Sequence, residues 1–206
     1  MTYETQIASL LSARICHDLV SPVGAVVNGV GLMQEIAGPS LADELSMIGQ
    51  SAGRASCMLQ FYRIAFGTGD ADASEIARGG IEAQAAELVQ SSKVSFALTG
   101  ADGPPMPRRD GKIFCLMILC ARALVGLRGS VRANLSPPDP YRMSVSVQSD
   151  AALSNASFLE IIQAPVETSA VPPRAVEFLL LKAAVEQSGM QIDIAASDTD
   201  ASIAVI

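Results

Sequence analysis

An unbroken heptad pattern of apolar residues over residues 41–66 constrains the fold of this chain more than any other feature. Its members are spaced alternately four and three residues apart: Leu41, Leu45, Ile48, Ala52, Ala55, Leu59, Tyr62 and Phe66. Such spacing places one apolar seam along an α-helix that packs lengthwise on another helix. The pattern predicts a helix of about 26 residues, which is about 39 Å long at 1.5 Å per residue.

Residues 2–35 supply the partner helix. Its apolar stripe contains Ile7, Leu11, Ile15, Leu19, Val26, Val30 and Met33, and the opposite side carries Arg14, His17, Ser21, Gly24, Asn28 and Glu35. Gly38 and Pro39 end this helix, so the two helices are predicted to form an antiparallel hairpin. Because the stripe is wider than one partner helix covers, we expect a homodimer whose two hairpins form a four-helix bundle.

After residue 68 the pattern changes to an irregular alternation of helices and strands. Helices are predicted over residues 73–90, 109–127, 155–163 and 172–187, and strands over 93–98, 129–135, 141–148, 191–196 and 202–206. This order indicates an α+β sandwich with helices on one face of a mixed sheet. We therefore expect a hairpin domain over residues 1–68 and an α/β sandwich domain over residues 69–206.

Composition excludes several classes of protein. The 206 residues carry a net charge of -7, whereas proteins that bind nucleic acid duplexes or anionic membranes need a surplus of Lys and Arg. No run reaches the roughly 18 apolar residues of a membrane helix, and the N-terminus does not resemble a signal peptide. The four cysteines form no CxxC pair and are predicted to be small buried hydrophobic residues, and a single histidine excludes a multi-histidine metal site. We expect a soluble cytoplasmic protein.

His17 is the candidate reactive residue. It lies opposite the apolar stripe, next to Asp18, on a side whose small and polar residues allow the backbone of another protein to approach. A neutral imidazole is a good nucleophile toward phosphorus, and Asp18 can orient the ring or accept its proton. On spacing alone, a solvated surface histidine remains the alternative.

The run from His17 to Pro22 resembles the phosphoacceptor box of sensor histidine kinases, which has a histidine, an acidic residue next to it and a proline five positions after the histidine. Residues 69–206 resemble the ATP-binding domain of these kinases in element order and length. The nucleotide motifs are missing, because residues 113–122 contain no Asn for magnesium and residues 149–153 and 164–173 contain no glycine. A kinase-like core with an intact histidine box and a degenerate nucleotide site is similar to the alphaproteobacterial histidine phosphotransferases of the ChpT type.

This resemblance implies a phosphotransferase of a two-component phosphorelay that does not bind ATP. His17 would be the phosphoacceptor and Asp18 the adjoining acid, with the receiver domain of a hybrid histidine kinase as donor and response regulators as acceptors. The resemblance implies that the degenerate domain contacts partners and that the receiver, not this chain, holds Mg²⁺. No nucleic acid or membrane partner is expected. Partner docking is expected along Arg14, Ser21, Gly24, Asn28 and, level with His17 across the hairpin, Gln60.

Two alternatives remain open at the level of sequence. One is a non-catalytic dimeric module that binds receiver or kinase domains and does not need His17. The other is an autophosphorylating kinase with an unusual nucleotide site, which would be labelled by ATP alone.

Overall fold

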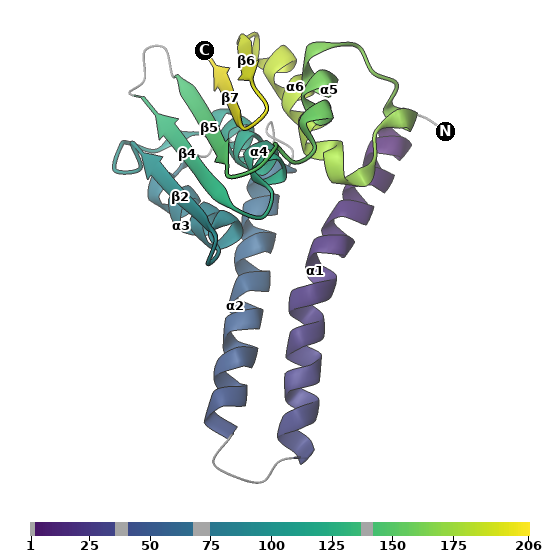
Figure 1. Cartoon of the computed structure of the whole chain (residues 1–206), viewed down its shortest axis with the longest axis vertical. Helices are drawn as coiled ribbons and strands as arrows, with labels where there is room; N and C mark the ends of the chain where they lie inside the picture. The colour runs from purple at the N-terminus through teal and green to yellow at the C-terminus, as the bar shows by residue number, and fades with distance from the viewer. Residues whose placement is uncertain (1–2, 36–40, 68–74, 137–141) are drawn as a thin grey trace.

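The computed structural model describes residues 3–35, 41–67, 75–136 and 142–206. A long helical hairpin projects from a domain in which helices cover a sheet (Figure 1). The elements in chain order are α1 (Tyr3–Glu35), α2 (Leu41–Ala65), β1 (Glu75–Ile76), α3 (Arg78–Val89), β2 (Val94–Thr99), β3 (Met106–Pro107), α4 (Arg108–Val125), β4 (Gly129–Leu135), β5 (Met143–Ser149), η1 (Ala156–Phe158), α5 (Leu159–Gln163), η2 (Thr168–Ala170), η3 (Pro173–Ala175), α6 (Val176–Ser188), β6 (Ile192–Ala196) and β7 (Asp200–Val205).

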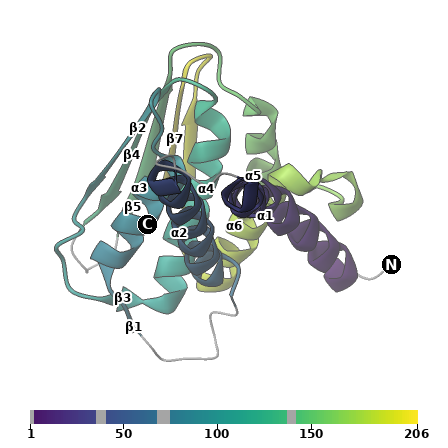
Figure 2. The same ribbon diagram turned by 90° about the horizontal axis from the view of Figure 1, so that it is seen from below.

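Helices α1 and α2 form the predicted antiparallel hairpin, with 33 and 25 residues (Figures 1 and 2). The N-terminal half of α1 packs on η2, η3 and α6, whereas α2 packs on α3 and α4. The two helices of the hairpin therefore make most of their contacts with different elements of the second domain. The predicted turn at Gly38 and Pro39 and the predicted boundary after residue 68 lie outside the described residues.

The heptad seam of α2 divides into two faces. Ile48, Ala55 and Tyr62 are half-buried or buried in the protomer. Leu45 and Leu59 are 51% and 50% exposed, although they belong to the same seam. Residues seven apart share one line on the helix, so the line of Ile48 and Tyr62 packs inside the protomer, while the other line is open at Leu45 and Leu59 and half-buried only at Phe66.

The sheet of the second domain has the strand order β2-β4-β5-β7-β6. Strands β2 and β4 are parallel and the other neighbours are antiparallel, so the sheet is mixed as predicted. In β5, Met143, Val145 and Val147 are buried while Gln148 is exposed, which confirms the alternation expected for a sheet covered on one face. The α+β fold class is confirmed.

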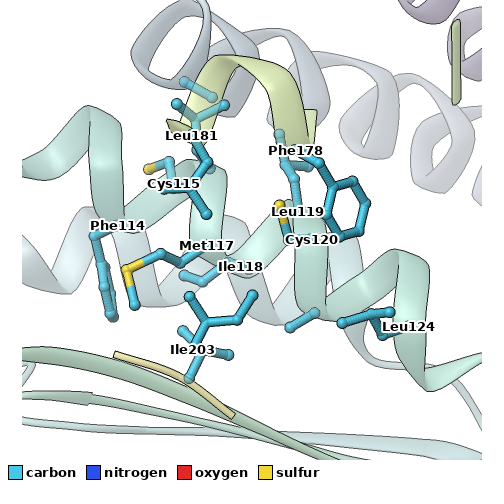
Figure 3. Packing of buried hydrophobic residues seen from close by; sticks show 14 of the residues in the cluster. Phe114, Cys115, Met117, Ile118, Leu119, Cys120, Leu124, Phe178, Leu181 and Ile203 are labelled. Carbon is cyan, nitrogen blue, oxygen red and sulfur yellow. The ribbon is translucent and has the colours of Figure 1, made fainter. Parts of the chain in front are cut away.

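Helix α4 is the centre of the hydrophobic core. Every residue from Ile113 to Ala121 is buried, because the helix lies between the sheet on one side and α6 and α2 on the other. Figure 3 shows Ile203 of β7 below α4 and Phe178 and Leu181 of α6 above it. The same cluster includes Phe61 of α2, so the base of the hairpin shares the core of the second domain.

Two local expectations were wrong. The helix predicted over residues 73–90 begins only at Arg78, because Glu75 and Ile76 pair with β3, a contact distant in sequence. Among the cysteines, Cys16 is exposed and Cys57 half-buried, so the prediction of buried thiols is confirmed only for the two in α4. The sequence has no unbroken run of roughly 18 apolar residues. Within α1, Glu4–Met33 is nevertheless long and apolar enough to cross a membrane, judged by length and composition only.

Candidate functional site

His17 lies near the middle of α1, and its side chain is 82% exposed. Its Nδ1 atom is 3.1 Å from Oδ1 of Asp18. A ring nitrogen that faces a carboxylate carries the proton of a neutral imidazole, so the geometry favours the tautomer protonated on Nδ1. Nε2 then keeps its lone pair on a ring that is open to solvent, which is the arrangement that nucleophilic attack on phosphorus requires.

Asp18 is buried, with only 6% of its side chain exposed, and its carboxylate contacts residues of three helices. Arg14 on the preceding turn of α1 donates from Nη1 to Oδ1 over 2.8 Å. The hydroxyl of Tyr62 on α2 donates to Oδ2, and Nη1 of Arg122 on α4 lies 3.8 Å from the same oxygen. A carboxylate that lies away from water needs hydrogen-bond donors and opposite charges of this kind.

Glu177 on α6 connects this site to the second domain. Its side chain is fully buried, and its Oε1 accepts a hydrogen bond of 3.4 Å from Nη2 of Arg14. Burial raises the pKa of Glu177 from 4.5 to about 7, and the charge of Asp18 acts in the same direction, while Arg14 and Arg122 oppose the rise. Near neutral pH both protonation states of this carboxyl group are therefore populated.

Two grooves flank His17. One has a volume of about 630 Å³, and its walls include Arg54 of α2, Arg122 and the ends of α3 and α4. Leu127, which is 88% exposed, lies on the wall of this groove. The other groove, of about 640 Å³, lies between α1 and residues 172–174. Guanidinium groups beside an exposed imidazole fit an anionic group such as phosphoryl.

Three of the predicted docking residues lie on an open strip of α1. Ser21 and Asn28 are exposed, and Gly24 is half-buried. A Cβ atom added at Gly24 would meet no atom within 4 Å, apart from those of its own helix turn. Among the described residues, this strip is therefore free for close approach by a second protein.

The other two predicted docking residues make contacts within the protomer. Arg14 was expected on the free face, but its side chain is only 13% exposed and is paired with Asp18 and Glu177. Gln60 was expected level with His17 and is exposed, and its side chain accepts a 3.2 Å hydrogen bond from Gln84 of α3. The second domain therefore covers Arg14 and borders Gln60, and the hairpin pattern does not specify where that domain packs.

Sequence reasoning missed Tyr62, Arg122 and Glu177 as parts of the site. Tyr62 was assigned only to the heptad seam. Arg122 interrupts an apolar helix and Glu177 stands next to a run of apolar residues, and a charge in such a position needs a buried partner. The sequence therefore indicates that Arg122 and Glu177 have buried partners, but it does not indicate which residues those partners are.

A helical hairpin that presents an exposed histidine against an anchored carboxylate, packed on an α+β domain, is an arrangement suited to the transfer of a phosphoryl group through histidine. Residues 78–200 match the family described as histidine phosphotransferase C-terminal domain. The chain belongs to this family, and it is a phosphotransferase of a phosphorelay, with the kinase and response-regulator partners that a relay requires.

The relatives identify the type more closely. The chain is 32% identical over 196 residues to the protein phosphotransferase ChpT of Brucella abortus (strain 2308), covering 94% of this chain and 92% of that protein. A solved bacterial phosphotransferase matches with a TM-score of 0.79 and 30% identity, over 100% of this chain and 98% of that chain. The histidine kinase domain of a blue-light activated kinase from Erythrobacter litoralis EL346 has a TM-score of 0.49 and 10% identity, over 89% and 94% of the two chains. The resemblance to the ChpT type is confirmed.

Proposed function

We propose that His17 is the phosphoacceptor of this phosphotransferase. It receives the phosphoryl group from the aspartyl phosphate of a donor receiver domain and passes it to the receiver aspartate of a response regulator. The observation that carries the proposal is the geometry of His17, whose Nδ1 faces the buried Asp18 while the rest of the ring is open.

The chemistry of the transfer balances without a further reactant. The lone pair of Nε2 attacks phosphorus, the bond between phosphorus and the donor carboxylate breaks, and that carboxylate leaves with the electron pair. The phosphorylated ring keeps its proton on Nδ1 and gains positive charge, which Asp18 stabilises at 3.1 Å. The second transfer reverses these steps on another receiver.

The expected homodimer belongs to the same proposal. Exposed apolar residues line one face of α1 and the open face of the α2 seam: Val20, Val23, Val27 and Val30 on α1, and Leu45 and Leu59 on α2. A second hairpin covers these residues by forming a four-helix bundle. The docking surface for receivers then consists of His17, the strip of Ser21, Gly24 and Asn28, and the Arg54 wall of the adjoining groove.

We further propose that the chain works without ATP in the cytoplasm. The segments where the resemblance expects nucleotide loops contain no glycine, and one of them, residues 164–173, includes η2, which packs on α1. Mg²⁺ belongs to the receiver, whose phosphoryl group it shields. Neither nucleic acid nor membrane is proposed as a partner.

The test is a transfer assay with three proteins: wild type, His17→Ala, and Cys16→Ala as an exposed neighbouring control. Each is incubated with radiolabelled ATP and Mg²⁺, or with a phosphorylated receiver domain. We expect acid-labile label in wild type and Cys16→Ala only with the receiver, and none in His17→Ala. Label from ATP alone would establish a kinase instead. Receiver binding that survives in His17→Ala, with no label in wild type across a panel of receivers, would favour the non-catalytic interaction module.

A further inference from the structure

The carboxylate of Asp18 has both oxygens engaged, and the groups that engage them come from three helices. Oδ1 faces Arg14 and His17 on α1, and Oδ2 faces Tyr62 on α2 and Arg122 on α4. A carboxylate fixed at both oxygens cannot rotate about its χ2 angle. The direction of Oδ1 toward the imidazole is therefore set by groups that do not touch His17.

Tyr62 is the better defined of these groups. Its side chain is buried, and its ring packs on Phe66 with the ring centroids 5.0 Å apart, so the position of the hydroxyl is fixed. Burial, followed by the nearby charge of Asp18, raises the pKa of Tyr62, so the phenol stays protonated and remains a donor at all ordinary pH values. Arg14 and Arg122 act in the opposite direction without removing this effect.

Arg122 brings the second domain into the site. It projects from α4, the most buried helix of the domain, toward Oδ2 of Asp18. Its Nη1 atom is buried and has no hydrogen-bond partner within the described ranges, and it faces the carboxylate of Asp18 as an ion pair at 3.8 Å. The residue also lines the groove that contains His17.

We propose that Tyr62 and Arg122 are positioning residues for the phosphoacceptor. By fixing the carboxylate of Asp18, they keep the proton of neutral His17 on Nδ1 and leave Nε2 as the only nucleophilic nitrogen. The effect on transfer rests on the proposed function, whereas the effect on the tautomer does not. One consequence is that the second domain, through Arg122, takes part in preparing the histidine.

The single histidine of the chain makes the tautomer directly measurable. Long-range ¹H–¹⁵N NMR of the protein labelled at histidine distinguishes Nδ1–H from Nε2–H imidazole through the ¹⁵N shifts. The variants are Tyr62→Phe, which removes only the hydroxyl, Arg122→Gln, and Arg122→Lys, which keeps the charge. Phe66→Leu is the matched control, because it disturbs the same packing and leaves the hydroxyl in place.

We expect the Nδ1–H form to dominate in wild type and in Phe66→Leu, and the Nε2–H form to gain a clear share in Tyr62→Phe and Arg122→Gln, with partial recovery in Arg122→Lys. The rate of transfer from a phosphorylated receiver to His17 should fall by about tenfold in Tyr62→Phe, which is the scale typical of outer groups that fix the orientation of an imidazole through a hydrogen-bonded partner. Thermal melts confirm that each variant is folded.

An unchanged tautomer ratio in folded Tyr62→Phe and Arg122→Gln would overturn the proposal, and so would an equal shift in Phe66→Leu, which would assign the effect to packing. If wild type accepts no phosphoryl group from any receiver, the proposed function fails. The NMR comparison still decides the positioning role in that case.

Discussion

Replacing Glu177 with Gln tests how the buried charge pair between the hairpin and the second domain contributes to stability. The pKa of Glu177 is raised from 4.5 to about 7. A raised carboxyl pKa means that the folded state binds more protons than the unfolded state between these two values, so stability falls as the pH rises through this window. Glutamine has the shape of the protonated acid and cannot ionise.

The magnitude follows from the same two values. One pKa unit corresponds to about 1.4 kcal/mol, so the rise from 4.5 to about 7 corresponds to about 3 kcal/mol. At pH 5 the ionisation of Glu177 costs the folded state only about 1 kcal/mol, because folded Glu177 is protonated and the unfolded group is only partly ionised. Between pH 5 and pH 8, Glu177→Gln should therefore gain about 2 kcal/mol over wild type in its free energy of unfolding.

The assay is urea denaturation of both proteins at pH 5 and pH 8, at one fixed protein concentration. Glu186→Gln is the matched control, because Glu186 lies on the same helix and is exposed. Its stability should follow that of wild type at both pH values. If Glu177→Gln is no more stable relative to wild type at pH 8 than at pH 5, the ion pair with Arg14 outweighs the burial of the charge, and the reasoning is wrong.

Three further predictions concern the hairpin and the core. A Cβ atom added at Gly31 would meet no atom within 4 Å, so Gly31→Ala should raise the melting temperature through helix propensity. A Cβ atom added at Gly29 would lie 2.5 Å from the side chain of Ile48 on α2, so Gly29→Ala should raise the melting temperature less or lower it. Val27→Asp should shift the proposed dimer toward monomer in sedimentation velocity, because Val27 is 63% exposed on the apolar face and the dimer would bury the new charge. The neighbouring control Asn28→Asp should leave the sedimenting mass of the protein unchanged. Phe178→Ala should lower the free energy of unfolding by about 3–5 kcal/mol in urea titrations, because the ring is fully buried in the core. A loss below 1 kcal/mol would contradict the packing described for α6.

Most helices and strands of this protein were predictable from local pattern. The hairpin helices and the β4–β5 pair lie within a few residues of their predicted bounds, because a period of 3.6 or 2 repeats over enough residues to be unambiguous. At the end of α6, Gly189 takes the left-handed conformation that favours glycine after a helix. The exception is β1, two residues long, whose pairing with β3 joins segments about thirty residues apart.

The candidate site was predictable only in part. The exposure of His17 follows from its place on the helix opposite the apolar stripe, and Asp18 is its neighbour because the two residues are adjacent in the chain. The inward position of Arg14 and the contact of Gln60 with α3 depend on where the second domain packs. No periodicity within the hairpin contains that information.

The sequence by itself determined the helical hairpin, the α+β class and the face on which the histidine stands, since each depends on residues close together in the chain. Only the tertiary structure decided which line of the α2 seam is buried and which remains open. Only the tertiary structure brought Asp18, Tyr62, Arg122 and Glu177 from four helices into one buried charge network. The physical reason is that a buried charge requires a partner, but which distant residue meets it depends on how the two domains pack.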